Sequence, residues 1–484
     1  MTEREQELMK QATLEVEKHQ SSVQADKYRL DFHIMPPVGL LNDPNGFIDW
    51  NGTYHLFYQW NPFKTAHGAK FWGHYSSKDL VTWQSENTAL APSEWFEKNG
   101  CYSGSAIDHD GKLKLFYTGN VKDEQGNRET YQCLAESEDG ITFTKKGVVL
   151  TLPKGYTAHF RDPKVWKHND SWYMIIGAQS EQQEGKAVLF QSENLVDWQY
   201  RGAITGSHSD QLDEFGYMWE CPDLFHLNGQ DILIVSPQGL EPTGTYYQNT
   251  YQSGYFIGEL DYETATYRHG SFTELDRGFE FYAPQTMVDR YGRRLLFAWM
   301  GVPEQYEDEH PTIDHHWIHA MTIPRELKLV GSKLYQKPVE ELTNLRSEGV
   351  SYDRVTISEQ GQTLAGIEGG AIELIIDDFA EHPNHFEINI SETAKVVFDR
   401  EQSLFTLERK KFTSDEVEVR QCALDELHSL RIYLDHSSIE LFINDGEEVF
   451  TARIFPTGEQ LLSFLSGQSV KCRIRKWDIH SIYK

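Results

Sequence analysis

The segment DPNGFIDWNGTYHLFYQW (residues 43–60) is the first of five that share one layout: a polar start, a short apolar strand, a turn and a second strand. The other four are SGSAIDHDGKLKLFYTG (103–119), DPKVWKHNDSWYMIIG (162–177), ECPDLFHLNGQDILIVSPQG (220–239) and APQTMVDRYGRRLLFAWMG (283–301). Aligned on the second strand, their anchor residues follow at intervals of 59, 59, 59 and 63 residues. The anchors are Phe57, Phe116, Ile175, Ile234 and Phe297. Such a period indicates an internal structural repeat.

Each repeat predicts about four short strands joined by turns that contain Gly, Asn and Asp. No strong helical period lies between the strands, which argues against βαβ units. Radially repeated four-stranded sheets are the blades of a β-propeller, so five repeats predict five blades. A solenoid or a sandwich is the alternative, and it fits four-strand units with so little helix less well.

The character of the sequence changes after IPRELKL (323–329). From about Val350 many short alternating strands follow, such as LRIYLD and SSIELFIN, and these indicate a two-sheet sandwich. The prediction is an all-β fold, a five-bladed β-propeller followed by a C-terminal β-sandwich. The predicted divisions are a helical extension (1–28), the propeller (29–335), a linker (336–349) and the sandwich (350–484).

The composition limits the partners of the protein. Lys and Arg total 45 against 74 Asp and Glu, a net charge of −29, which repels nucleic acid and anionic membranes. A phosphorylated substrate is still possible, because a few Lys or Arg can dominate one pocket, although the sequence does not single them out. A homo-oligomer is equally possible.

The N-terminus lacks the apolar stretch of a secretion signal, and no run of about eighteen apolar residues exists in the chain. The five cysteines are scattered and show no C-x-x-C spacing, so neither disulfides nor a zinc site is suggested. We expect a cytoplasmic protein with free thiols. We predict neither a cofactor nor a metal, because the histidines between His310 and His319 have the composition of a solvated loop.

Three carboxylates lie near the starts of three repeats. Asp43, Asp162 and Glu220 precede the anchors of their repeats by 14, 13 and 14 residues. If these strands line the propeller axis, the three side chains converge at one mouth of its channel. Such convergence suits glycoside hydrolysis, which needs one ionised and one protonated carboxyl group. Taken singly, each residue is better explained as a turn former or an ion-pair partner, and it is the occurrence of three in register that favours a site.

Aromatic side chains near the repeat starts and strand ends could bind sugar, because the C–H faces of sugars stack on aromatic rings. About half of them are expected only to pack one blade on the next. They are Trp60, Trp72, Trp95, Tyr102, Tyr282 and Trp299.

At these residues the chain resembles glycoside hydrolase family 32, the family of invertases, fructanases and sucrose-6-phosphate hydrolases. The nucleophile motif of the family resembles PPVGLLNDPNG, with Leu40-Leu41 where the family has Trp-Met. FWGH (71–74), YSGS (102–105), FRDP (160–163), ECPDLF (220–225) and APQT (283–286) resemble further family motifs in the expected order. RIYLDHSSIELFINDGE (431–447) is similar to the signature of the family's sandwich domain.

The resemblance implies the roles of individual residues. Asp43 would be the nucleophile and Glu220 the acid/base, and Asp162, preceded by Arg161, would hold fructose hydroxyls and stabilise the transition state. Further residues match positions that line the fructosyl subsite: Asn42, Gln59, Trp72, Ser103 and Trp299. The implied reaction is retaining hydrolysis of a terminal β-D-fructofuranosyl bond through a covalent fructosyl-enzyme.

We favour sucrose 6-phosphate as the substrate, with sucrose close behind, because the missing secretion signal argues against an extracellular fructan polymer. The alternatives are a fructan exo-hydrolase, a fructosyltransferase, a propeller hydrolase acting on arabinan or xylan, and a sugar-binding propeller without activity. The intact Asp43, Asp162 and Glu220 argue against the last of these.

Overall fold

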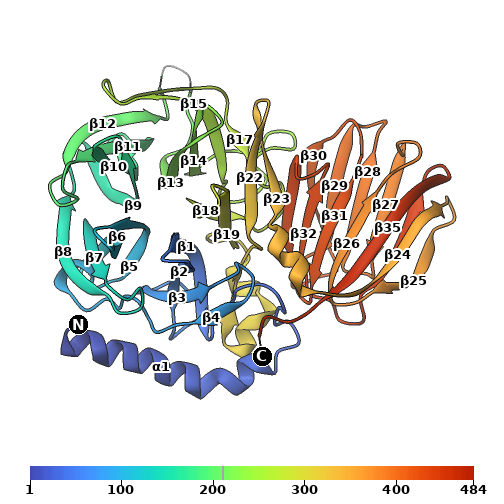
Figure 1. Cartoon of the computed structure of the whole chain (residues 1–484), viewed down its shortest axis with the longest axis horizontal. Helices are drawn as coiled ribbons and strands as arrows, with labels where there is room; N and C mark the ends of the chain where they lie inside the picture. Colours follow the sequence, from blue (N-terminus) through green and yellow to red (C-terminus); the bar gives the residue numbers. More distant parts are fainter. Residues whose placement is uncertain (210–211, 484) are drawn as a thin grey trace.

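In the computed structural model, which describes residues 1–209 and 212–483, the repeats form separate antiparallel sheets set around a common centre (Figure 1). The first sheet contains β1 (Gly39–Trp50), β2 (Thr53–Asn61), β3 (Phe71–Ser77) and β4 (Trp83–Ser85). The second contains β5 (Cys101–His109), β6 (Lys112–Lys122), β7 (Arg128–Ser137) and β8 (Thr144–Thr151). The third contains β9 (Tyr156–His168), β10 (Ser171–Ser180), β11 (Gly185–Ser192) and β12 (Gln199–Gly206).

The fourth sheet contains β13 (Met218–Leu227), β14 (Gln230–Gln238), β15 (Gly254–Asp261), β16 (Thr266–His269) and β17 (Thr273–Glu274). The fifth contains β18 (Tyr282–Val288), β19 (Arg294–Met300), β21 (Ala320–Met321), β22 (Arg325–Val330) and β23 (Lys333–Pro338). The chain then ties the last repeat to the first, because β20 (Trp317–Ile318) pairs in parallel with β1. The arrangement is that of an N-terminal propeller.

The anchor residues explain the period of the repeat. Each anchor is at most 1% exposed and lies in a different hydrophobic cluster, formed between one sheet and the next. Phe57 lies between the first and second sheets, and Phe297 lies in the cluster that joins the fifth sheet to the first. Full burial of such a side chain contributes about 1.5–3 kcal/mol. The period of the sequence therefore reflects the same packing contact between neighbouring sheets, which occurs five times.

The C-terminal region forms two six-stranded sheets with a shared apolar core. One contains β24 (Arg346–Ile357), β35 (Val470–Ile479), β26 (Ala371–Asp377), β31 (Leu430–Asp435), β32 (Ser438–Ile443) and β33 (Glu448–Arg453). The other contains β25 (Gln362–Glu368), β34 (Leu461–Ser466), β27 (His385–Ile390), β28 (Ala394–Asp399), β29 (Leu404–Lys410) and β30 (Val417–Ala423). Buried and half-buried residues alternate along β27 and β28, as the sandwich prediction requires.

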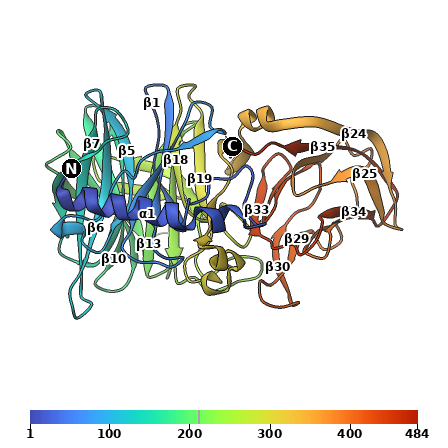
Figure 2. The ribbon, with the colours of Figure 1, turned by 90° about the horizontal axis from the view of Figure 1, so that it is seen from below.

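Among the described residues the α-helical content is one element, α1 (Glu3–Gln24), which runs outside the first sheets (Figures 1 and 2). Its buried Ala12 packs into the cluster between the fifth and first sheets. Its buried Glu5 pairs with Lys145 of β8 at 3.1 Å, and Lys145 also contacts Glu97. The described helices include none that is long and apolar enough to span a membrane.

A buried polar network joins the propeller to the sandwich, which lie side by side along the long axis of the molecule (Figure 2). Arg325 of β22 donates to Glu440 of β32 at 2.5 Å and to Asp276 at 3.2 Å. His33 contacts the second oxygen of Glu440 at 2.9 Å and Asp435 at 2.8 Å. All of these side chains are fully buried. Burial lowers the pKa of His33, but the hydrogen bonds to both carboxylates outweigh this effect and raise it.

We predict that Arg325→Ala lowers the free energy of unfolding by about 3–5 kcal/mol, because it leaves Asp276 buried without its cation and Glu440 with His33 alone. Lys328→Ala on the same strand is the control. Lys328 is half exposed and, among the described residues, its one ion pair is with Glu326, so its loss should cost less than about 1 kcal/mol. Urea unfolding followed by fluorescence measures both. Equal losses in the two variants would show that the network does not stabilise the domain contact.

Candidate active site

The inner strands of the N-terminal sheets enclose a cavity of about 650 Å³ at the centre of the propeller. Each of the five sheets contributes side chains to its wall, in part from the starts of the first strands. The residues from these starts are Asn42, Asp43, Tyr102, Ser103, Arg161, Asp162, Glu220 and Tyr282. Five sheets that are far apart in the sequence therefore meet at one polar site.

β-Bulges aim these side chains. In β1 the pairing with β2 shifts between Leu41 and Pro44, in β9 an equivalent shift falls at Asp162, and in β13 it follows Glu220. A bulge sets two residues against one, which turns the strand and re-aims its side chains. The backbone of Asp162 takes a φ of 66°, a left-handed conformation that is strained for an aspartate.

The strand pairing corrects the predicted register of the three carboxylates. The anchors pair with Asn45, Ser105, Lys164, Asp223 and Gln285. Counted from these partners, Asp43 and Asp162 hold the same position, whereas Glu220 lies one residue earlier, level with Arg161 and Tyr282. β1, β5 and β9 thus each supply two adjacent residues to the cavity, whereas β13 and β18 each supply one.

Asp43 is held by donors on both sides of its carboxylate. The Ser103 hydroxyl donates to Oδ2 at 2.5 Å, and the Asn42 amide donates to Oδ1 at 3.0 Å. Behind Asn42, the buried Lys70 ammonium donates to its Oδ1 at 2.8 Å. Burial raises the pKa of Asp43, the Ser103 hydrogen bond opposes that rise, and the charge of Glu220 adds to it. Burial also lowers the pKa of Lys70 to about 7.

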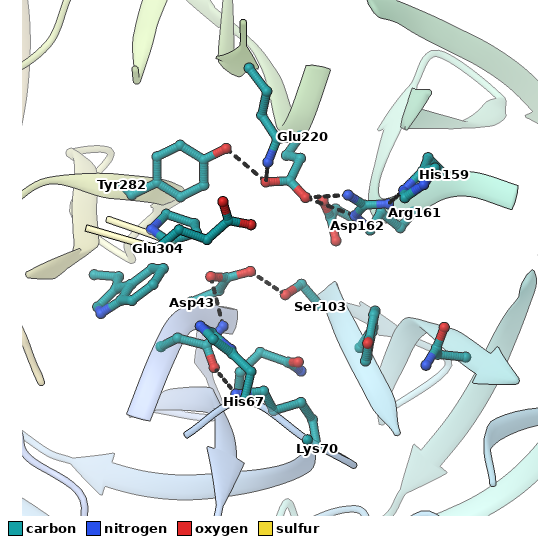
Figure 3. A pocket seen from close by; sticks show the side chains of 18 of the residues that line it. Asp43, His67, Lys70, Ser103, His159, Arg161, Asp162, Glu220, Tyr282 and Glu304 are labelled. Carbon is teal, nitrogen blue, oxygen red and sulfur yellow. Dashed lines mark hydrogen bonds and ion pairs between the residues drawn. The ribbon is translucent and has the colours of Figure 1, made fainter. Parts of the chain in front are cut away.

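Glu220 has donors at both of its oxygens. The Arg161 guanidinium donates twice to Oε1, at 2.8 and 2.5 Å, and Tyr282 and Gln238 donate to Oε2 at 2.7 and 3.0 Å. Burial alone would raise the pKa of Glu220, but the charge of Arg161 and the hydrogen bond from Tyr282 hold it below its ordinary value. The carboxyl groups of Glu220 and Asp43 face the same space (Figure 3).

Asp162 lies close to the Cys221 thiol, beside Arg161 (Figure 3). Its Oδ2 accepts from the backbone N–H of Cys221 at 2.9 Å, and the thiol lies 3.5 Å from that oxygen and 3.7 Å from Oδ2 of Asp43. Burial raises the pKa of Asp162 to about 7. The charge of Arg161 opposes this rise, and the charges of Glu220 and Asp43 add to it. Asp43, Asp162 and Cys221 offer ligand atoms within 4.8 Å of one another, but protein donors already occupy them, which supports hydrogen-bonded carboxylates rather than a metal site.

The cavity brings together most of the residues named from the sequence. Those that line it are Asn42, Asp43, Gln59, Tyr102, Ser103, Arg161, Asp162, Glu220 and Trp299. Trp72 is not part of the lining: it is fully buried, packs on Phe57 and Tyr117, and donates its indole N–H to the Tyr102 carbonyl oxygen at 3.1 Å. It therefore lies behind the cavity wall, next to Tyr102 and to its cross-strand partner Gln59.

Other lining residues were not expected from the sequence. They include Lys70, Lys122, Arg128, His159, Gln238 and Glu304. Most come from loops or strand ends, where the repeat gives no signal. Tyr282 was expected only as an aromatic residue, although its place one residue before Ala283-Pro284 matches that of Glu220 before Cys221-Pro222. That match could have linked it to the site.

Asp43 and Glu220, two carboxylates that line one polar cavity, supply the pair of groups that a glycoside hydrolase needs. The chain belongs to glycosyl hydrolase family 32. The description "Glycosyl hydrolases family 32 N-terminal domain" matches residues 33–338, and "Glycosyl hydrolases family 32 C terminal" matches residues 341–481. This confirms the resemblance noted from the sequence motifs.

Similar proteins cover almost the whole chain. The sucrose-6-phosphate hydrolase of Bacillus subtilis (strain 168) is 57% identical over 458 residues, which are 94% of this chain and 95% of that protein. The sucrose-6-phosphate hydrolase of Salmonella typhimurium is 47% identical over 91% of both chains. Among solved structures, the GH32 beta-fructofuranosidase of Bombyx mori is 36% identical and covers 98% of both chains, with a TM-score of 0.86.

We predict that Ser103→Ala moves the acidic limb of the kcat/KM–pH profile to higher pH. The Ser103 hydrogen bond lowers the pKa of Asp43, so its loss lets that pKa rise further and leaves less ionised Asp43 at a given pH. The loss of one charge-assisted hydrogen bond should also lower kcat/KM about tenfold at neutral pH. Ser103→Thr keeps the hydroxyl and should keep the limb near that of the unmodified protein. If the acidic limb does not shift in the alanine variant, the Ser103 hydrogen bond does not set the pKa of the group that controls this limb.

Proposed function

We propose that the protein hydrolyses the terminal β-D-fructofuranosyl bond of sucrose 6-phosphate, and of sucrose, with retention of configuration. The observation that carries the proposal is the convergence of Asp43 and Glu220 on one cavity, each held by its own set of donors. The names of the relatives at 57% and 47% identity support the same substrate. The solved structure of the Bombyx mori enzyme in complex with sucrose supports a sugar in this fold.

In this proposal Asp43 is the nucleophile. Its ionised carboxylate attacks C2 of the fructosyl unit through an oxocarbenium-like transition state and forms a covalent fructosyl-enzyme. Ser103 and Asn42 orient the carboxylate and favour its ionised form. The attack is accompanied by the transfer of a proton to the leaving oxygen.

Glu220 is the acid in the first step and the base in the second. It protonates the glycosidic oxygen and then takes a proton from the water that releases fructose. In the empty cavity Arg161 holds Glu220 in its ionised form, so the bound sugar must displace or lengthen this ion pair before Glu220 carries a proton. Arg161 has a second partner in His159, whose Nδ1 lies 3.0 Å from Nη1.

Asp162, with Arg161, is proposed to hold the fructose hydroxyls and to stabilise the transition state. Asn42, Gln59, Tyr102, Ser103 and Trp299 complete the wall of the fructosyl subsite. Trp72 supports this wall from behind by holding the Tyr102 backbone. We also propose that the N-terminal sheets are the five blades of a closed propeller (29–335), and that the helical extension (1–28), the linker (336–349) and the sandwich (350–484) complete the chain.

The test is the release of fructose from sucrose 6-phosphate, sucrose and inulin by the purified protein. We expect both sucrose substrates to be cleaved, with the higher kcat/KM for the phosphorylated sugar. Asp43→Ala and Glu220→Gln should each lower kcat by at least about a hundredfold, because each removes a group that reacts or transfers a proton. Asp108→Ala is the matched control, an exposed aspartate at the far end of β5.

Release from inulin alone would make the protein a fructan hydrolase. If none of the three sugars releases fructose, the proposal is refuted and a sugar-binding propeller is favoured.

A further inference from the structure

Two unpaired cations face each other at one side of the cavity. Lys122, the last residue of β6, and Arg128, the first residue of β7, are direct cross-strand partners, and both side chains line the cavity. Directly opposed side chains of an antiparallel pair lie on the same face of the sheet. Within the described part of the chain, neither side chain forms an ion pair, although Asp and Glu far outnumber Lys and Arg.

Several positive charges act on this part of the cavity, together with the more distant Glu220. Arg128 is half-buried, and burial together with the charge of Arg161 lowers its pKa. Its guanidinium lies 5.9 Å from the centre of the Tyr102 ring. Burial and the charges of Arg161 and Arg128 lower the pKa of His159 to about 4. Cations brought together without an anion form a site that an anionic ligand would complete.

The other cations of the cavity are already engaged. Lys70 is buried and donates to Asn42, and His67 lies 3.0 Å from Glu307. Arg161 is paired with Glu220. Lys122 and Arg128 are thus the cations left for a ligand.

Their place in the cavity also fits the chemistry. Glu220, the proposed acid, contacts Arg161, which contacts His159, and both Arg128 and Lys122 act electrostatically on His159 (Figure 3 shows the first three). This series leads away from Asp43, where the fructosyl unit binds in the proposed reaction. It begins at Glu220, which protonates the leaving oxygen in the proposed reaction, so it lies on the side of the cavity where the leaving group would bind.

We propose that Lys122 and Arg128 form an anion subsite that binds the phosphate of the departing sugar phosphate. This inference rests on the proposed function and names its specificity residues. Arg128 supplies a planar pair of N–H donors and Lys122 a compact charge, and both suit a phosphate dianion. Unphosphorylated sucrose leaves this subsite empty, so it gains nothing from either residue.

The test compares kcat/KM for sucrose 6-phosphate and for sucrose in the single and double alanine variants at Lys122 and Arg128. For the phosphorylated sugar we expect a loss of about 10- to 100-fold per residue, and for sucrose a change within about twofold. Arg128→Lys keeps the charge but not the paired donors and should lie between. Lys154→Ala, an exposed lysine outside the cavity, is the control and should change neither rate.

The outcomes separate the two proposals. Equal losses on both sugars, or no loss on the phosphorylated sugar, would overturn the anion subsite and leave fructosyl hydrolysis intact. If the unmodified protein releases no fructose, the function fails, and calorimetry with glucose 6-phosphate then tests the subsite alone. Binding that the double variant loses would support the subsite, and binding that the double variant retains, or no binding to the unmodified protein, would overturn it.

Discussion

The apolar faces of the N-terminal sheets are buried against one another, and a sheet that lacked a neighbour would expose its face to water. The buried anchors Phe57, Phe116, Ile175, Ile234 and Phe297 each fill a different contact between neighbouring sheets. Because the cluster that contains Phe297 joins the fifth sheet to the first, the sheets surround a common centre. The starts of the first strands have to meet there, and this packing constraint creates the site.

Placing several carboxylates in one partly buried cavity is unfavourable unless donors accompany them. Asp43 has Ser103 and Asn42, Glu220 has Arg161, Tyr282 and Gln238, and Asp162 has the backbone of Cys221. These donors make the three groups chemically different, because burial raises the pKa of Asp43 and Asp162 whereas Arg161 keeps that of Glu220 low. Catalysis needs the opposite order of pKa values, with Asp43 ionised and Glu220 protonated. A bound sugar that separates Arg161 from Glu220 would favour this order, because it removes the charge that keeps the pKa of Glu220 low.

Much of the fold could be predicted because it repeats. The 59-residue interval reflects a single packing contact, so the strands, the anchors and the convergence of Asp43, Asp162 and Glu220 follow from the sequence. The register of Glu220 could not be predicted, because β1 contains a second bulge between Asn45 and Ile48 that adds one residue between Asp43 and its anchor. Equal spacing along the chain therefore does not give Asp43 and Glu220 the same position on their strands. Lys122 and Arg128 lie at the end of a hairpin, and Arg325 contacts the sandwich. The roles of these three residues therefore could not be predicted from the repeat.

In the proposed reaction Asp43 becomes covalently linked to the fructosyl unit. The most direct test uses Glu220→Ala with an activated fructosyl donor whose leaving group needs no proton, so that the first step proceeds and the second is slow. Mass spectrometry of the rapidly denatured protein should then find one added fructosyl unit, on the peptide that contains Asp43. An adduct on Asp162, or no adduct while fructose is still released, would contradict the account.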